Sequence, residues 1–316
     1  MALHPGAKWV VDAAATALEQ GQTPIEEKTA DQARAFYSDS RGALTPDLPD
    51  MALVEDFSIP GPHGDIAVRY YRPAGSDAAD KLPLCLFYHG GGWVIGDLES
   101  HDYVCRRMTN SGGFAVISVD YRMAPEHKFP VAIEDAWAAL KWAAEGAGDR
   151  AIDAGRLAVA GDSAGGNLAA VMALMARDNN GPAIKFQGLI YPATNMNMIT
   201  QSHEDFAEGH ILTAKSMDWF QDHYLNSAQD REDWRASPIK HDNHGDLPPA
   251  FVVTAGHDPL RDEGKAYADL MSEAGVDVTY TCYDGQIHGF FTMAKVIDES
   301  DVAIDEIAAA ISAGLK

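Results

Sequence analysis

One serine of the chain lies in a setting that suits nucleophilic catalysis, the motif Gly161-Asp162-Ser163-Ala164-Gly165, which has the pattern G-x-S-x-G. An apolar run before it, residues 157–160, predicts a buried strand, and residues 167–174 after it predict a helix. A serine on such a sharp strand-to-helix turn has an exposed hydroxyl, and the helix N-terminus places partial positive charge beside it. The five-residue pattern alone is weak, and Ser163 is also suited to capping the helix. The prediction of a nucleophile therefore depends on its partners.

A serine hydroxyl needs a base, and the base needs a carboxylate that orients it. Where the serine lies on a strand-to-helix elbow, the acid and then the histidine follow it along the chain. Asp258 directly follows an apolar, strand-like run, and His288 lies in the loop after the last predicted strand. Both positions belong to the sheet edge that carries Ser163, so we predict that these three residues form a catalytic triad. His257 and Asp262 are the competing candidates.

A glycine-rich stretch, His89-Gly90-Gly91-Gly92-Trp93, follows another strand-like run. Successive glycines let the backbone N–H groups approach a ligand with no Cβ in the way. A phosphate cradle is the alternative, but no Lys-Ser/Thr pair follows and the next polar residues, Asp97 and Glu99, are acidic. The pattern favours an oxyanion hole, which binds the negative oxygen of a tetrahedral intermediate. The expected N–H donors are Gly91, Gly92 and Ala164.

Strand-like and helical segments alternate along most of the chain. Residues 54–59 and 65–72 predict two strands. Six short apolar runs predict strands that are buried on both faces: 82–88, 114–120, 156–160, 186–191, 250–255 and 278–283. Four segments predict helices between them: 100–111, 132–144, 164–177 and 261–274. The first two strands flank a turn and predict an antiparallel hairpin. The rest of this alternation predicts an α/β fold with an eight-stranded, mostly parallel sheet flanked by helices.

Composition limits the possible partners and compartment. The 316 residues have a formal net charge of −23, which disfavours nucleic acid and anionic membrane surfaces as partners. No apolar stretch is long enough to span a bilayer, and the N-terminus lacks the features of a signal peptide. Three cysteines without paired spacing suit a reducing compartment, and the histidines show no metal-binding spacing. We expect a cytoplasmic protein with no metal site.

The motifs together resemble the hormone-sensitive-lipase-like family of microbial carboxylesterases, in the branch whose elbow reads G-D-S-A-G. Five stretches carry the resemblance: 88–93, 119–126, 161–166, 258–264 and 288–290. The resemblance implies an α/β-hydrolase fold with a helical cap, hydrolysis of short-to-medium acyl esters through an acyl-enzyme, no cofactor and, in many relatives, a homodimer. One departure is Asn195, where relatives often carry aspartate, at the expected hinge of the cap.

Two helical segments without strand signals correspond to the cap. We expect residues 1–50 to be its N-terminal part and residues 195–240 its second part, over an α/β-hydrolase core formed by residues 51–194 and 241–316. The cap would cover an apolar pocket and select acyl length. Five side chains are candidates to line this pocket, with ordinary packing as the alternative: Trp93, Ile211, Leu212, Trp219 and Phe220.

Several charged residues near the motifs suit structural support better than chemistry. Asp120, Arg122 and Glu126 are expected to hold the loop beside the glycine-rich stretch by charge-assisted hydrogen bonds, and Asp162 is a further candidate for support. Three other functions use the same fold: a binding module, an amidase or peptidase, and a lyase. A binding module or a lyase is expected to lack a triad residue, whereas an amidase would use the same groups as an esterase.

Overall fold

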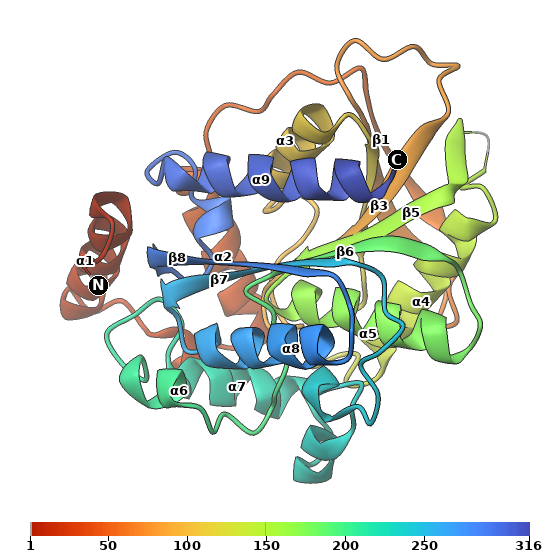
Figure 1. Ribbon diagram of the computed structural model, residues 1–316. Helices are drawn as coiled ribbons and strands as arrows, with labels where there is room; N and C mark the ends of the chain where they lie inside the picture. Colours follow the sequence, from red (N-terminus) through yellow and green to blue (C-terminus); the bar gives the residue numbers. More distant parts are fainter. Residues whose placement is uncertain (1, 149) are drawn as a thin grey trace.

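The computed structural model describes residues 2–148 and 150–316. Within them, eight strands form one sheet in the order β1-β2-β4-β3-β5-β6-β7-β8 (Figure 1). The strands are β1 (Leu53–Ile59), β2 (Ile66–Arg72), β3 (Leu82–Tyr88), β4 (Ala115–Asp120), β5 (Ile152–Asp162), β6 (Ile184–Ile190), β7 (Ala250–His257) and β8 (Val278–Ile287). The predicted eight-stranded sheet is confirmed, although β5 and β8 are longer than the apolar runs that predicted them.

Strand direction places the ends of the central strands together. β2 pairs antiparallel with β1 and with β4, whereas each pair from β4 through β3, β5, β6 and β7 to β8 is parallel. At the centre, Tyr88 of β3 is opposite Gly161 of β5. The glycine-rich loop after β3 and the Ser163 turn after β5 therefore leave the sheet side by side.

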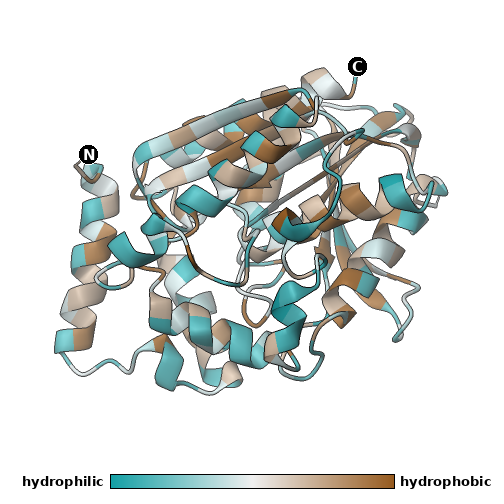
Figure 2. Ribbon diagram, turned by 60° about the horizontal axis from the view of Figure 1, so that its bottom comes forward, coloured by the Kyte–Doolittle hydropathy of each residue, from teal (hydrophilic) through white to brown (hydrophobic). Residues whose placement is uncertain are grey.

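Helices cover both faces of the sheet (Figure 1). The helices against the sheet are α3 (Asp102–Gly112), α4 (Val131–Ala144), α5 (Ala164–Asp178), α8 (Arg261–Glu273) and α9 (Glu299–Gly314). Alternate residues of β3 point to opposite faces: Leu84 and Leu86 join the core with α4, α5 and α8, while Cys85 and Phe87 join the core with α3 and α9. In Figure 2 the central strands are largely hydrophobic, while the outer helices also carry hydrophilic residues. The α/β-hydrolase architecture predicted from the sequence is confirmed.

The four predicted core helices are present, and α9 is an additional one that the sequence reading did not assign. α9 buries Ile304, Ile307 and Ile311 against the sheet. These residues recur at helical spacing, which is the signal that predicts the helix. The segment follows the last motif of the chain, and apart from Val302 and these isoleucines its apolar residues are alanines.

Apart from η4 (Phe290–Thr292), which follows β8, the remaining helical elements fall in the two segments that we expected to form a cap. The first segment contains α1 (Pro5–Glu19), η1 (Ile25–Glu27) and α2 (Ala30–Leu44); the second contains α6 (Gln201–Asp205), α7 (Ala214–Tyr224), η2 (Ala228–Glu232) and η3 (Pro238–Lys240). η1 packs against α7, so the two segments touch although they are far apart in sequence. α1 lies at the side of the molecule, next to β8 (Figure 1).

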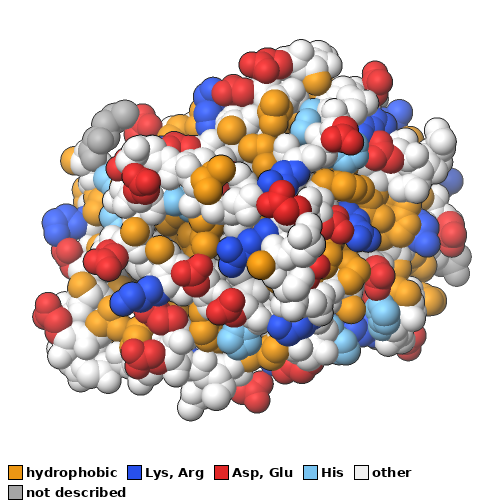
Figure 3. Space-filling model, turned by 90° about the horizontal axis from the view of Figure 1, so that it is seen from below, with side chains coloured by type: hydrophobic (Ala, Val, Ile, Leu, Met, Phe, Trp, Pro, Cys, Tyr) orange, Lys and Arg blue, Asp and Glu red, His pale blue; other side chains and the backbone are white. Residues whose placement is uncertain are grey.

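The surface combines both signs of charge despite the excess of acidic residues. Seen from the side of α6 and α7, acidic, basic and hydrophobic side chains are interspersed (Figure 3). Within the described part of the chain, no helix has the length and apolar character needed to cross a membrane. The cysteines contribute to the interior: Cys85 and Cys105 are buried and unpaired, and burial raises the pKa of both thiols, which keeps them protonated.

Candidate active site

Ser163 lies on a strained turn between β5 and α5. Its backbone has φ 55° and ψ −117°, a conformation that L-residues rarely adopt outside functional sites. The Ser163 N–H donates to the Ile190 carbonyl at 2.8 Å, which ties the turn to the neighbouring strand β6. A Cβ at Gly161 or Gly165 would collide with the backbone carbonyl of Tyr88. The two motif glycines therefore let the turn pass directly against β3.

The structure brings Ser163, His288 and Asp258 into one hydrogen-bonded chain. His288 Nε2 is 2.9 Å from Ser163 Oγ, and His288 Nδ1 is 2.7 Å from Asp258 Oδ2. The ionised Asp258 carboxylate accepts, so Nδ1 carries the imidazole proton and the Nε2 lone pair faces the serine hydroxyl. Asp258 is fully buried, and its Oδ1 accepts the N–H of Leu260 at 2.9 Å. This chain can remove a proton from Ser163 and stabilise the resulting imidazolium.

The two competing candidates take other positions. Asp262 pairs with Arg261 at 2.8 Å and accepts the N–H of Ser202 in α6 at 2.9 Å. The His257 ring lies 5.5 Å from the ring of Phe206 and 5.9 Å from that of His210, both in the second predicted cap segment. These contacts of Asp262 and His257 lie outside the Ser163–His288–Asp258 chain.

The ring of Tyr191 supports the imidazole, a contact that the sequence reading missed. Its centroid is 4.7 Å from that of His288. Tyr191 is fully buried, and this burial raises the pKa of its phenol well above the ordinary value. It follows directly after β6, where a signal was available: the apolar run of β6 ends in an aromatic residue at the same sheet edge as Ser163.

The glycine-rich loop has an unusual backbone conformation at three successive residues. Gly91 and Gly92 have φ values of 121° and 58°, and Trp93 also has a positive φ, 60°. A Cβ on Gly91 would meet the Ile95 carbonyl, and one on Gly92 would meet the Phe220 ring. Within the described residues, neither glycine N–H has a hydrogen-bond acceptor. The Ala164 N–H begins α5, where the helix leaves such groups unpaired, so all three predicted donors are free to bind an anionic oxygen.

Asp162, the neighbour of the serine, connects the elbow to the glycine-rich loop. Its Oδ1 accepts the N–H of Gly90 at 2.8 Å and lies 3.1 Å from Nε2 of His101. Burial by itself raises the pKa of Asp162, but His101 and the Gly90 N–H outweigh it and lower the pKa below 3.8. The carboxylate is therefore held in its charged form, in the support role predicted for it.

The first residue of the loop is a neutral, buried histidine. Its Nδ1 is 2.8 Å from the Gly90 carbonyl, so His89 donates there, and its ring stacks on Tyr121 with centroids 4.4 Å apart. Burial lowers the pKa of His89 to about 4. Asp120 Oδ1 lies 4.0 Å from His89 Nε2, and burial, followed by the charge of Asp97, raises the pKa of Asp120 to about 6. These groups shape the loop and do not touch Ser163.

The other charged residues of the 119–126 stretch have partners outside that stretch. Arg122 donates to Asp135 at 2.8 Å and to the carbonyls of His63 and Asp65 in the turn between β1 and β2. Glu126 pairs with Arg34 of α2, at 2.6 Å and 2.9 Å. Sequence reasoning missed Arg34, because nothing in its local sequence distinguishes it from a solvated arginine on a helix.

The five candidate pocket residues fall into two groups. Trp93 is buried and stacks on Tyr224 with ring centroids 4.3 Å apart, and Trp219 is buried and packs edge-on against Phe220. Ile211, Leu212 and Phe220 are half-buried. The Phe220 ring lies so close to Gly92 that a Cβ there would collide with it.

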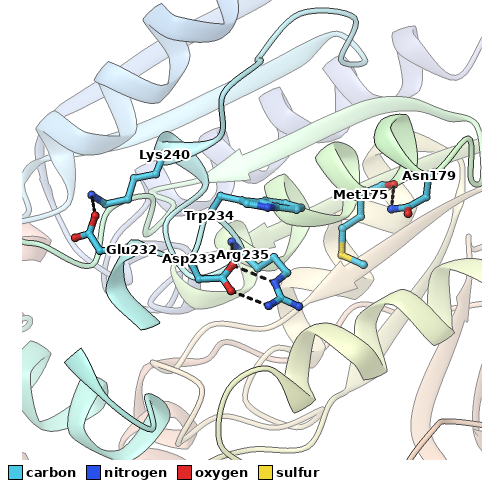
Figure 4. A pocket seen from close by; sticks show the side chains of 7 residues that line it. All are labelled: Met175, Asn179, Glu232, Asp233, Trp234, Arg235 and Lys240. Carbon is cyan, nitrogen blue, oxygen red and sulfur yellow. Dashed lines mark hydrogen bonds and ion pairs between the residues drawn. The ribbon is translucent and has the colours of Figure 1, made fainter. Parts of the chain in front are cut away.

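A separate surface cavity of about 480 Å³ lies at the other end of α5 (Figure 4). Its lining includes Met175, which is twelve residues after Ser163 on the same helix and thus about 18 Å away. Its charged side chains already pair with each other, Arg235 with Asp233 at 2.7 Å and Lys240 with Glu232 at 2.8 Å. The cavity does not belong to the Ser163 site.

Within the described residues, no group of three or more His, Cys, Asp or Glu side chains is arranged to hold a metal.

Comparison with known proteins places the chain in a family. Residues 85–292 match the Abhydrolase_3 model, described as alpha/beta hydrolase fold. A carboxylic ester hydrolase, LipN, of Mycobacterium tuberculosis is 44% identical over 83% of this chain and 70% of its own. An ethyl acetate hydrolase of Pseudomonas putida is 36% identical over 88% of each chain.

Solved structures agree with the sequence relatives. An ester hydrolase from the metagenome of Lake Arreo, complexed with a derivative of bipyridine phosphonate, has a TM-score of 0.95 at 42% identity over 98% of each chain. An esterase from Pyrobaculum calidifontis has a TM-score of 0.92 at 43% identity over 99% of each chain. The chain belongs to the α/β-hydrolase fold family. Within that family it is a serine carboxylic-ester hydrolase, consistent with the predicted resemblance to the hormone-sensitive-lipase-like carboxylesterases.

Proposed function

We propose that this carboxylesterase hydrolyses short-to-medium acyl esters with Ser163 as nucleophile, His288 as general base and acid, and Asp258 as the orienting carboxylate. The observation that carries the proposal is the chain of two hydrogen bonds, 2.9 Å and 2.7 Å long, that joins the three side chains. Gly91, Gly92 and Ala164 supply the oxyanion hole. Each donor is worth about 3 kcal/mol of transition-state stabilisation.

The reaction proceeds in two half-reactions. Ser163 Oγ attacks the ester carbonyl carbon while its proton passes to His288 Nε2, and the carbonyl oxygen becomes an oxyanion held by the backbone N–H groups. The tetrahedral species collapses as His288 protonates the leaving alcohol, which leaves the acyl group on Ser163. A water molecule then gives its proton to His288 and attacks the acyl-enzyme, and the second collapse releases the acid and restores the serine hydroxyl.

Substrate length is the task of the cap, which we propose is formed by residues 1–50 and 195–240. The contact between η1 and α7 supports one cap made from both segments. Phe220 of α7 lies against Gly92, so the acyl or alcohol group has an aromatic wall near the reacting carbon. An ethyl acetate hydrolase among the relatives supports short acyl groups.

The test is a panel of p-nitrophenyl esters from C2 to C16 together with a p-nitroanilide, assayed with wild type, Ser163→Ala and Asp258→Asn. We expect wild-type kcat/KM to be highest at or below about C8, and to fall at least about 10⁴-fold in Ser163→Ala. Asp258→Asn is expected to lose about 10⁴-fold, because the amide no longer holds the required imidazole tautomer. Circular dichroism and Tm serve as controls for folding. A folded Ser163→Ala protein that retains activity would refute the nucleophile, and hydrolysis of the anilide at the ester rate would refute the substrate class.

A further inference from the structure

The glycine-rich loop needs external support, because three successive residues have unusual backbone conformations. Gly91, Gly92 and Trp93 all have positive φ, and the Trp93 conformation is strained for a residue with a side chain. Inside the loop, the Gly91 carbonyl accepts the N–H groups of Val94 and Ile95 at 3.1 Å and 2.9 Å. These bonds close the turn but do not fix its position relative to Ser163.

One end of the loop is already anchored to the serine elbow. The Gly90 N–H donates to Asp162, which neighbours Ser163 in the chain. On the other side of Gly91 and Gly92, the Val94 carbonyl accepts the Nε–H of Arg34 at 2.9 Å. Val94 is fully buried, so its carbonyl would otherwise lie without water.

Arg34 binds two loops at once through its planar fork. Besides Val94, it donates from Nη2 to the Ala124 carbonyl at 2.9 Å, and the Ala124 N–H donates in turn to the Trp93 carbonyl at 2.8 Å. Glu126 completes the arrangement with bonds of 2.9 Å and 2.6 Å to the two terminal nitrogens. The arginine side chain keeps 26% of its surface exposed, and its bond to Glu126 lowers the pKa of that carboxyl to about 2, so the pair stays charged at neutral pH.

We infer that Arg34, on helix α2 outside the catalytic core, is a positioning residue that holds the Gly91 and Gly92 N–H groups at the height of the oxyanion. The inference rests on the proposed function, since it assumes that these N–H groups bind the tetrahedral intermediate. The guanidinium fixes the carbonyl of Val94 and, through Ala124, that of Trp93, so the strained segment between Gly90 and Val94 is clamped at both ends. A lysine cannot replace it, because one ammonium group cannot span two carbonyls and a carboxylate in this planar arrangement.

The consequence for kinetics is specific. A displaced oxyanion hole weakens binding of the tetrahedral species and leaves ground-state binding of the ester largely intact. Arg34→Met keeps most of the apolar stem and removes the fork. We expect its kcat on p-nitrophenyl butyrate to fall about 10- to 100-fold while KM changes less than about threefold, a smaller loss than the 10²–10³ typical of a deleted oxyanion donor.

A tetrahedral adduct provides a second readout. An alkyl trifluoromethyl ketone accepts Ser163 Oγ at its carbonyl carbon, the serine proton moves to His288, and the carbonyl oxygen becomes an oxyanion in the hole. We expect the Ki of this ketone to rise in Arg34→Met by about the same factor as kcat/KM falls. Arg34→Lys should preserve the pairing with Glu126 and still show the loss of kcat, which separates the backbone contacts from the ion pair. If Arg34→Met does not fold, Arg34→Lys alone carries the test.

Arg107 offers a matched control. It is 27% exposed, forms a two-pronged pair with Asp305 at 3.0 Å and 2.6 Å, and connects α3 to α9 away from the catalytic loops. Arg107→Met is expected to lower Tm without a change in kcat or in the ketone Ki.

Two results would overturn the inference: kcat and Ki within twofold of wild type in folded Arg34→Met, or in Arg34→Lys where Arg34→Met does not fold; or an equal loss of kcat in Arg107→Met. The proposed function fails separately, if wild type does not hydrolyse the ester or Ser163→Ala still does.

Discussion

The carboxylate of Asp162 offers a sharp test of how the Ser163 elbow and the glycine-rich loop are coupled. Asp162→Asn keeps the shape of the side chain and removes its charge. The amide oxygen can still accept the Gly90 N–H and face His101, so both groups keep a neutral acceptor in place of the carboxylate. What is lost is the charge assistance of two buried contacts, 2.8 Å and 3.1 Å long.

The magnitude follows from those two contacts. Hydrogen bonds to a charged group contribute about 1.5–3 kcal/mol to stability and neutral ones about 0.5–1.5 kcal/mol, so loss of the charge weakens the two contacts by about 2–3 kcal/mol together. Part of this loss is offset, because the variant no longer buries a charge. The lowered pKa of Asp162 indicates that the favourable contacts outweigh burial, so the net change is destabilising, about 1–2 kcal/mol. Asp162→Ala leaves both donors buried without an acceptor and should lose about 3–5 kcal/mol.

Urea unfolding and ester kinetics measure the two consequences. Because the folded pKa lies below the ordinary value of 3.8, the stabilisation by Asp162 is present above that pH and is lost as pH falls through the folded pKa. The difference between wild type and Asp162→Asn should therefore be constant from about pH 5 to pH 8 and shrink below about pH 4. We also expect kcat to fall, by about tenfold, as the Gly90 anchor weakens.

Asp153 provides the control for this prediction. It also accepts one backbone N–H, from Gly155 at 3.0 Å, and pairs with one cation, Arg156 at 2.8 Å, but it is 37% exposed and lies near the start of β5, away from the elbow. Asp153→Asn should change stability by less than about 1 kcal/mol and leave kcat unchanged. An Asp162→Asn protein as stable and active as wild type, or more stable, would refute the reasoning.

Two further predictions concern the loop and its surroundings. Gly92→Ala would place a methyl group against the Phe220 ring, at a backbone φ of 58°, so kcat/KM should fall at least about 100-fold. Adding Phe220→Ala should restore kcat/KM about tenfold. A double variant no more active than Gly92→Ala would contradict the steric explanation. Burial raises the pKa of Asp120 to about 6, so its contribution to stability is present below 3.8 and is lost as pH rises through about 6. The side chain is 35% exposed, and solvent screening therefore limits the effect: Asp120→Asn should raise the free energy of unfolding by about 1 kcal/mol at pH 8 and by little at pH 4. Urea unfolding at both pH values measures this difference, and equal gains would show that charge is not the cause.

The local features of the site could be predicted from the sequence because their physics is local. A serine between a buried strand and a helix, with glycines on either side, is compatible with few backbone conformations, and the structure places Ser163 at φ 55° on that turn. The apolar runs located the central strands β3 to β7, because a strand covered on both faces must be apolar along its length, and the hairpin pattern located β1 and β2. Helix α9 was not predicted, although Ile304, Ile307 and Ile311 recur at helical spacing.

Contacts between distant segments could not be predicted from local sequence patterns. Twelve histidines occur in the chain, and only the fold brings His288 within 2.9 Å of Ser163, 125 residues earlier. Arg34 and Glu126 are 92 residues apart, and a lone helical arginine is indistinguishable in sequence from one that faces water. The two segments of the proposed cap are likewise distant in sequence, and no local pattern indicates the contact between η1 and α7.

The sequence by itself determined which residues can do chemistry and which strand each of them follows. Strand, turn and helix propensities act over a few neighbouring residues, so these features can be read locally. The sequence also selected Asp258 and His288 as the acid and base, but only the tertiary structure brings them within hydrogen-bond distance of each other and of Ser163. It alone shows that an arginine from α2 binds the Val94 carbonyl of the glycine-rich loop. The physical reason is range. A hydrogen bond forms only near 3 Å, and for groups a hundred residues apart that distance is set by the packing of the whole sheet and its helices.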